Sequence, residues 1–211
     1  MKKNHPVSSD QIPNYYRANR PGFYQWLGKY FLYILGWQVN GEIAGVKDGE
    51  NLVVIVAPHT SNWDGALGLA TIIGLDARIS FIGKHTVFRF GLGWFLKSLG
   101  GIPVNRSVPG DVVLKIVKKI KKNPGTLFAM APEGTRSKVS EWKSGFLRIA
   151  KEIQANVLMA SIDFSAKEIL LGDIYIPTGD NEKDILALKY IFKDYRGRHS
   201  SRHLSPSDLN V

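Results

Sequence analysis

The chain has 211 residues and no cysteine, and its 28 Lys and Arg against 18 Asp and Glu give a net charge of +10. This length suits one α/β domain with a full core, and the missing thiols exclude disulfides and thiolate metal sites. The positive charge favours a polyanionic partner, such as nucleic acid, anionic lipid or a phosphorylated substrate.

The first twenty residues and the stretch after them differ sharply. Residues 1–20 are polar, contain Pro6 and Pro13, and lack both a period and a signal-peptide pattern, so we expect a mobile arm. Residues 21–38 predict an amphipathic helix with a narrow polar strip, too short to span a bilayer. Its Trp and Tyr side chains suit a helix lying in the membrane interface. Packing on the protein's own core is the other interpretation of this helix.

Strands and helices alternate over residues 39–196. Strands are predicted at residues 39–46, 52–56, 79–82, 126–131, 157–162 and 169–176, with a very short one before residue 105. Helices are predicted at residues 65–73, 86–99, 111–122, 143–154 and 180–194, and the lysines of the third read as a solvated face. This alternation predicts a single α/β domain with a mostly parallel central sheet flanked by helices. Residues 197–211 are basic and are expected to form a mobile tail.

A histidine and an aspartate follow the most apolar strand. The stretch VVIVAPHTSNWD, residues 53–64, places His59 and Asp64 in a strand-to-helix connection, where open α/β sheets bind their ligands. If the loop folds back, Asp64 accepts a hydrogen bond from Nδ1 of His59, and Nε2 faces a substrate as a general base. Asp64 as a simple helix cap is the alternative.

Two further strands also end in polar loops. Asn105 and Arg106 follow the short strand, and the sequence PEGTRS, residues 132–137, follows the strand at 126–131. Because carboxyl ends of parallel strands share an edge, these groups are expected to line one cleft with His59. Two arginines converging there suit a phosphate, although Glu133 beside Arg136 also fits a local ion pair.

These blocks resemble those of a known family. HTSNWD, GGIPVNRS and APEGTRS look like the first three sequence blocks of the glycerolipid acyltransferases, which include the glycerol-3-phosphate and 1-acylglycerol-3-phosphate acyltransferases. Order and spacing also match, and the resemblance covers roughly residues 52–176. The fourth block of the family carries prolines in a hydrophobic strand, whereas the matching stretch VLMASID, residues 157–163, has none.

The resemblance implies a role for each matching residue. His59 is the general base and Asp64 orients it, while Arg106 contacts the phosphate of the acceptor. The remainder of that phosphate site is formed by Glu133, Gly134, Thr135 and Arg136. No metal and no cofactor beyond the acyl donor are implied, and the histidines are not spaced as a zinc cluster.

The implied function is transfer of a fatty acyl group from an acyl thioester to a hydroxyl of a phosphorylated glycerol acceptor such as lysophosphatidic acid. Coenzyme A and acyl carrier protein both remain open as the carrier of the thioester. With the helix at residues 21–38, this predicts a peripheral or monotopic enzyme on the cytoplasmic face of the cell membrane. The alternatives are the same chemistry on another acceptor and a non-catalytic membrane-surface protein. Nucleic-acid binding is disfavoured, because no recognised motif is present and the aromatics do not lie among the lysines.

Overall fold

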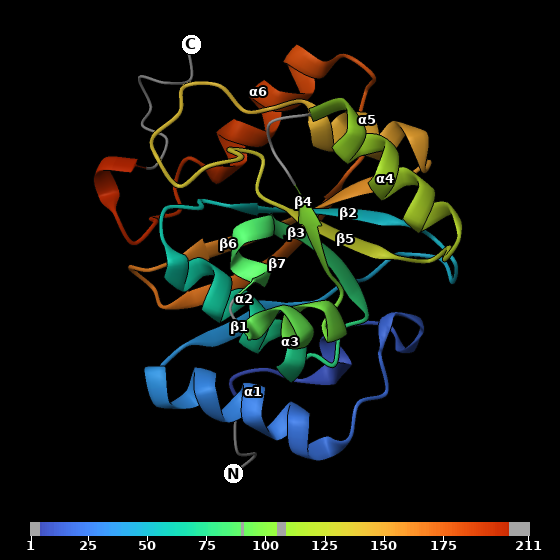
Figure 1. The fold of residues 1–211 in the computed structure, drawn as a ribbon. Helices are drawn as coiled ribbons and strands as arrows, with labels where there is room; N and C mark the ends of the chain where they lie inside the picture. Colours follow the sequence, from blue (N-terminus) through green and yellow to red (C-terminus); the bar gives the residue numbers. More distant parts are fainter. Residues whose placement is uncertain (1–4, 90, 105–108, 203–211) are drawn as a thin grey trace.

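The computed structural model describes residues 5–89, 91–104 and 109–202. These residues form a seven-stranded sheet in the order β1-β7-β6-β2-β5-β3-β4, with helices on both faces (Figure 1). Neighbouring strands are parallel except for β6 and β7, which pair in antiparallel fashion. The prediction of a single α/β domain with a mostly parallel sheet is confirmed.

The elements follow the predicted order with shifted bounds. The strands are Gln38–Gly41 (β1), Leu52–Ala57 (β2), Ile79–Lys84 (β3), Gly101–Val104 (β4), Leu127–Met130 (β5), Asn156–Asp163 (β6) and Glu168–Tyr175 (β7). The α-helices are Gly22–Leu35 (α1), Asn62–Gly74 (α2), Leu92–Ser98 (α3), Pro109–Lys121 (α4), Gly145–Glu152 (α5) and Asn181–Phe192 (α6). Short 3₁₀ turns lie at Ser9–Gln11, Asn14–Tyr16, His85–Phe88 and Ser200–Arg202.

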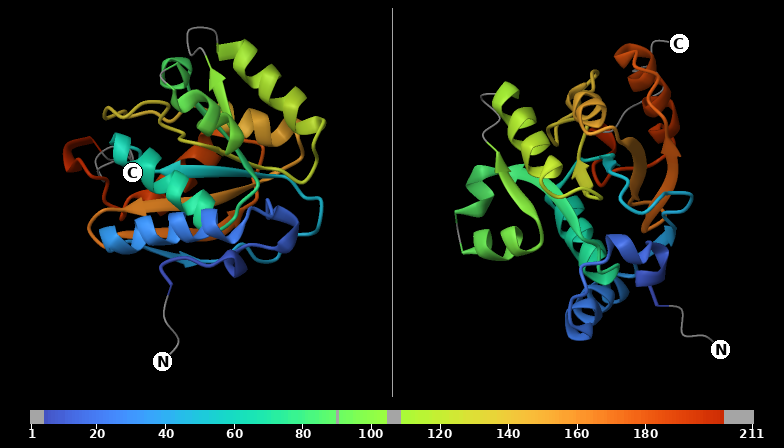
Figure 2. Two further views of the ribbon diagram at one scale, coloured as in Figure 1. Left: turned by 60° about the horizontal axis from the view of Figure 1, so that its bottom comes forward. Right: turned by 90° about the vertical axis from the view of Figure 1, so that its right-hand side faces the viewer.

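The sheet separates two apolar cores. Leu52 and Val54 of β2 belong to a core shared with α1 and α2, whereas Val53 and Ile55 belong to a core shared with α4, α5 and α6. Both faces of the central strands are therefore buried, which explains their continuous apolar sequence. Figure 2 shows the same division, with α1 and α2 on one side of the sheet and α4, α5 and α6 on the other.

Residues 5–20 do not form the mobile arm that their polar composition predicted. Val7, Ile12 and Tyr16 are at most 2% exposed and belong to the core that contains α1 and α2. The Tyr16 hydroxyl donates to the carbonyl of Glu50 at 2.8 Å, and the Gln11 amide donates to two carbonyls of β1 at 2.8 Å each. Three buried side chains spread over ten residues produce no helical or strand period. The sequence of this segment therefore does not reveal that it packs on the core.

The helix predicted over residues 86–99 is divided into a 3₁₀ turn, His85–Phe88, and the shorter helix α3. Gly91 lies between them with a φ of 68°, which interrupts helical geometry. A side chain on Gly93 would collide with the carbonyl of Phe88, so this glycine is needed for close packing. The strand predicted at residues 39–46 likewise ends early at Gly41, which has a φ of 76°.

Helix α1 packs on α2 through glycines. A Cβ atom on Gly28 would lie 2.6 Å from the carbonyl oxygen of Ala70 and 2.6 Å from the nitrogen of Gly74. The helix ends at Gly36, whose left-handed φ of 69° forms the C-cap. Within the described residues, no helix is both long enough and apolar enough to cross a membrane.

We predict that Gly28→Ala destabilises the protein, because the added methyl group forces α1 away from α2 and overpacking of this kind costs about 1–3 kcal/mol. Gly68→Ala is the matched control: Gly68 also lies inside a helix, but a Cβ atom there meets nothing within 4 Å. The control should instead gain about 0.5–1 kcal/mol from reduced backbone entropy. Urea unfolding measures both; equal effects of the two substitutions would contradict the close contact.

Candidate active site

The loop after β2 is short and is held by a capping box. Residues 58–61 connect β2 to α2, and Ser61 is the N-cap of that helix. The Ser61 hydroxyl accepts from the N–H of Trp63 at 3.2 Å, while the Asp64 carboxylate accepts from the N–H of Ser61 at 2.7 Å. This reciprocal pattern fixes the start of α2 and places Asp64 beneath the loop that carries His59.

His59 and Asp64 face each other as the sequence predicted. Nδ1 of His59 lies 3.1 Å from Oδ2 of Asp64. Oδ2 also accepts from the N–H groups of Thr60 and Ser61 at 2.7 Å, and Oδ1 accepts from the Ser61 hydroxyl at 2.7 Å. Asp64 therefore both caps α2 and contacts the imidazole. The sequence left these two roles as alternatives.

The electrostatics of the pair favour an ionised aspartate. Burial by itself would raise the pKa of Asp64, but hydrogen bonds from the His59 ring and from the N–H and hydroxyl of Ser61 hold it below its usual value. The His59 side chain retains 25% exposure, against 1% for Asp64. With Nδ1 directed at Asp64, Nε2 is the ring nitrogen available for chemistry.

Glu133 lies behind this loop. Strand β5 runs parallel beside β2, so the loop after β5 meets the loop after β2. Both carboxylate oxygens of Glu133 accept from the backbone N–H of His59 at 3.0 Å. Burial raises the pKa of Glu133 to about 7; the His59 N–H opposes this shift and the charge of Asp64 adds to it. Within the described residues, no ion pair joins Glu133 to Arg136.

Three of the other predicted site residues, Gly134, Thr135 and Arg136, directly follow Glu133 in the sequence. Gly134 has a φ of 67°, and its N–H donates to the carbonyl of Ala131 at 3.2 Å, so the chain turns here. The Thr135 hydroxyl accepts from the N–H of Ser137 at 3.3 Å, and the Arg136 side chain is exposed. Arg106 lies outside the described residues. The structure therefore brings His59, Asp64 and Glu133 into contact, and leaves Arg136 at the surface of the same edge.

Residues 197–202, the part of the expected mobile tail that the structure describes, contact the loop after β2. The N–H of His199 donates to the Thr60 hydroxyl at 3.3 Å, and the Arg202 guanidinium donates to the Thr60 carbonyl at 3.3 Å. A Cβ atom on Gly197 would lie 2.5 Å from Cγ2 of Thr60, which itself is fully buried. These contacts join residues about 140 positions apart, and nothing in the sequence signals them.

The His59–Asp64 pair provides an oriented imidazole beside a carboxylate whose pKa is lowered, an arrangement that can act as a general base. Across the part of the chain that the structure describes, no three His, Asp or Glu side chains are grouped as metal ligands.

Residues 42–163, more than half of the chain, match the family model described as Acyltransferase, and the chain belongs to that family. The resemblance carried by HTSNWD, GGIPVNRS and APEGTRS is confirmed.

Two known 1-acylglycerol-3-phosphate acyltransferases are similar to this chain. The chain is 24% identical over 143 residues to a 1-acyl-sn-glycerol-3-phosphate acyltransferase of Streptococcus pneumoniae; the match covers 64% of this chain and about half (52%) of that relative. The crystal structure of the 1-acyl-sn-glycerophosphate (LPA) acyltransferase PlsC from Thermotoga maritima superposes with a TM-score of 0.56 at 21% identity. The superposition covers 82% of this chain and 76% of the Thermotoga maritima protein. At this identity the superposition supports the fold.

We predict that the buried carboxyl of Glu133 makes stability fall as pH rises. The folded state holds its proton up to a pKa of about 7, against an ordinary value of 4.5. The free energy of unfolding should therefore decrease between about pH 4.5 and 7, by roughly 3 kcal/mol in total. Glu133→Gln cannot ionise and should lose this dependence. Urea unfolding at each pH measures the effect.

The exposed carboxyl of Glu141 provides the control, because Glu141→Gln should keep the pH dependence of the unsubstituted protein. Asp64, whose folded pKa is lowered, influences stability only at more acidic pH. Parallel curves for Glu133→Gln and the unsubstituted protein would contradict a raised pKa at Glu133.

Proposed function

We propose that this protein transfers a fatty acyl group from an acyl thioester to a hydroxyl of a phosphorylated glycerol acceptor such as lysophosphatidic acid. The observation that carries this proposal is the 3.1 Å approach of His59 Nδ1 to the buried Asp64 carboxylate at the carboxyl edge of β2. Membership of the acyltransferase family and the acyltransferase activity named for the two relatives support it.

In the proposed mechanism His59 works as a base without a covalent enzyme intermediate. Nε2 removes the proton of the acceptor hydroxyl, and the oxygen attacks the thioester carbonyl to form a tetrahedral oxyanion. The oxyanion collapses, the carbon–sulfur bond breaks, and the leaving thiolate takes the proton back from the imidazolium. The ionised Asp64 stabilises that imidazolium. Base catalysis of this type contributes about 10²–10⁴-fold to the rate.

The acceptor phosphate is assigned to the basic groups at the same edge. Arg136 is exposed next to the loop that holds Glu133, and a guanidinium binds phosphate in a bidentate manner. In this proposal Arg136 acts with Arg106, and the turn at Gly134 and Thr135 positions Arg136. Glu133 supports the backbone of His59 and does not itself contact the negatively charged phosphate.

We predict that His59→Ala lowers acyl transfer by about 10²–10⁴-fold while the protein stays folded, because the ring is partly exposed and three of the four hydrogen bonds to Asp64 remain. Asp64→Asn should also lose rate, by favouring the wrong imidazole tautomer. His199→Ala removes an exposed imidazole near the loop and serves as the control. The measurement is mass spectrometry of lipids made from an acyl thioester and acceptors with or without phosphate.

Other outcomes would contradict the proposed mechanism or favour a different function. Near-normal turnover in His59→Ala would remove the general base from the mechanism. Equal acylation of acceptors that lack phosphate would favour another lipid or polar acceptor for the same chemistry. No acyl transfer with any donor or acceptor would favour a non-catalytic membrane-surface protein.

The membrane contact is assigned to the outer face of α1. Large apolar side chains cover this face with exposures between 40% and 69%: Phe23, Tyr24, Trp26, Leu27, Tyr30, Tyr33 and Ile34. The rings of Phe23, Trp26 and Tyr30 stack in a row, with centroids 6.0 Å and 5.1 Å apart. An apolar patch of this size with interfacial aromatics suits a helix lying in a bilayer surface. The proposed location is peripheral, at the cytoplasmic face.

One aromatic residue of the segment 21–38 belongs to the core and not to the exposed face. Trp37 is 5% exposed and packs edge-on against Phe164, with ring centroids 4.8 Å apart. Trp94 of α3 is 79% exposed.

We predict that the double substitution Trp26→Ser and Tyr33→Ser releases the protein from anionic vesicles, because it removes exposed apolar area at about 25 cal/mol per Å². Turnover on vesicle-bound acceptor should fall more than turnover on a monomeric short-chain acceptor. Leu186→Ser with Tyr190→Ser, exposed on α6 across the sheet, is the control. Sedimentation and both assays test this; equal losses on both acceptors would mean that α1 has no membrane role.

A further inference from the structure

Residues 196–202, hereafter the C-terminal segment, bring cations to a part of the site that otherwise lacks them. From residue 52 to 77 the sequence has no Lys or Arg, and this stretch contains β2, the loop of residues 58–61 (hereafter the His59 loop) and α2. The C-terminal segment contains three arginines and no Asp or Glu. Where it contacts the His59 loop, it therefore adds positive charge to the site.

Backbone contacts and one glycine anchor the C-terminal segment. The carbonyl of Arg196 accepts from the N–H of Phe164 at 2.8 Å, and the N–H of His199 donates to the Thr60 hydroxyl at 3.3 Å. Gly197 is buried, and a Cβ atom there would lie 2.5 Å from Cγ2 of Thr60. These contacts fix the path of the segment without any guanidinium, so packing alone does not explain its arginines.

Two guanidiniums of the C-terminal segment lie against the His59 loop and the start of α2. Arg202 donates to the carbonyl of Thr60 at 3.3 Å, which places it beside the residue that follows His59. Arg198 lies over the ring of Trp63, with its Cζ 5.2 Å from the ring centroid, in a cation–π contact. Across residues 5–89, 91–104 and 109–202, the Arg198 guanidinium makes no hydrogen bond or ion pair. Its N–H donors are therefore available to a ligand.

A phosphorylated acceptor needs positive charge close to His59. Asp64 and Glu133 place two buried carboxyl groups beside the His59 loop, and negative charge there repels a phosphate. In 1-acylglycerol-3-phosphate the acceptor hydroxyl and the phosphate are on neighbouring carbons, so the phosphate binds near the nitrogen that takes the proton. Guanidiniums at the His59 loop itself meet this requirement, because they bind phosphate through charge-assisted, bidentate hydrogen bonds.

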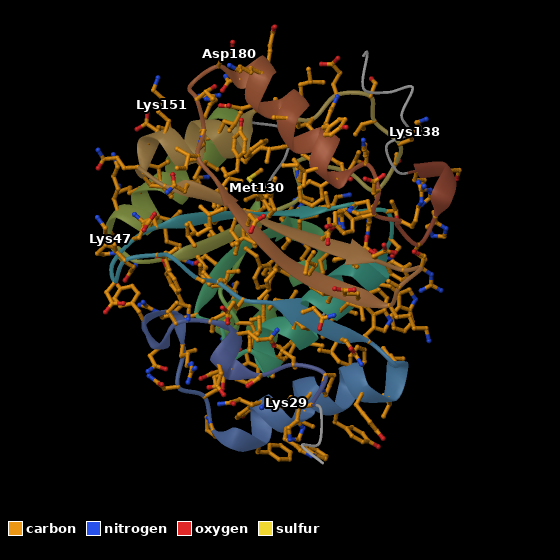
Figure 3. The ribbon with its side chains drawn as sticks, turned by 180° about the vertical axis from the view of Figure 1, so that it is seen from behind. Lys29, Lys47, Met130, Lys138, Lys151 and Asp180 are labelled. Carbon is orange, nitrogen blue, oxygen red and sulfur yellow. The ribbon has the colours of Figure 1, made fainter. Side chains whose placement is uncertain are left out.

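The C-terminal segment and the loop after β5 border the same edge of the sheet. Figure 3 shows Lys138, in the loop after β5, on the same side of the molecule as the 3₁₀ turn Ser200–Arg202, with Lys47, which precedes β2, on the opposite side. Both segments also contact the His59 loop, one through Glu133 and the other through the contacts with Thr60. Cations can therefore reach an acceptor at His59 from both segments.

We propose that Arg198 and Arg202 bind the phosphate of the acceptor, so that the C-terminal segment selects phosphorylated acceptors. This inference rests on the proposed acyl transfer and adds two specificity-determining residues to it. The phosphates of coenzyme A suit this site less well, because the long pantetheine arm separates them from the thioester sulfur, whereas Arg202 lies next to the base.

The test compares two acceptors with the same short acyl chain, a lysophosphatidic acid and a monoacylglycerol, both as monomers in solution. Arg198→Gln and Arg202→Gln each remove one charge, and Arg198→Lys keeps it. Lys193→Gln is the matched control, because Lys193 also lies over an aromatic ring, 3.5 Å from the centroid of Tyr190 on α6. Isothermal titration calorimetry of each acceptor without donor measures binding independently of turnover.

We expect each Gln variant to raise the Kd and the KM for lysophosphatidic acid by about tenfold, through loss of a charge-assisted contact. The kcat should fall much less than the KM rises, and monoacylglycerol should be affected much less than lysophosphatidic acid. Arg198→Lys should recover most of the affinity, and Lys193→Gln should leave it unchanged. Binding of lysophosphatidic acid should weaken with salt as the charges are screened.

Three results would overturn the proposal. These are an equal fall in kcat for both acceptors with KM unchanged, an equal weakening of both acceptors, and an increase in KM confined to a coenzyme A donor. Arg198→Gln keeps the test decisive if Arg202→Gln does not fold, because the Arg198 side chain contacts a ring at the surface. Phosphate-dependent binding that requires Arg198 and Arg202, in a protein without acyl transfer, would support this site and reject the proposed function.

Discussion

The geometry of the site depends on one buried carboxylate. Removing an ion from water costs several kcal/mol in a protein interior, and Asp64 offsets this cost with four donors from His59, Thr60 and Ser61 at 2.7–3.1 Å. The same contacts start α2, fix the path of the loop and orient the imidazole. Local folding and proposed catalysis therefore share one set of hydrogen bonds around Asp64.

Two distant segments complete the support of this loop. Glu133 reaches the His59 backbone because β5 pairs in parallel register with β2, and the chain near Gly197 closes on Thr60 from the other end of the sequence. A base must be held closely to act efficiently. Asp64, Glu133 and the C-terminal segment each contact the loop. The position of His59 therefore depends on parts of the fold that are far apart in the sequence.

Periodicity and local chemistry carried most of the prediction from sequence. The apolar run of β2, the His59–Asp64 spacing and the sequence blocks were enough to predict a mostly parallel sheet and the approach of these two side chains. Contacts that bury isolated residues left no such pattern. Tyr16 lies in a polar stretch. The apolar pattern around Trp37 fits core packing and lipid contact equally well, and the role of Glu133 depends on sheet register. The break at Gly91 shows that apolar content alone did not predict helix length.

The sheet also separates two different surfaces. The apolar patch on α1 and the exposed lysines of α4 lie in opposite layers, while His59 lies at the strand edge that both layers border. In the proposed function the layer of α1 meets the lipid, and the layer of α4, α5 and α6 lies on the other side of the sheet. The doubly covered parallel sheet allows this arrangement because its functional edge is open to both layers.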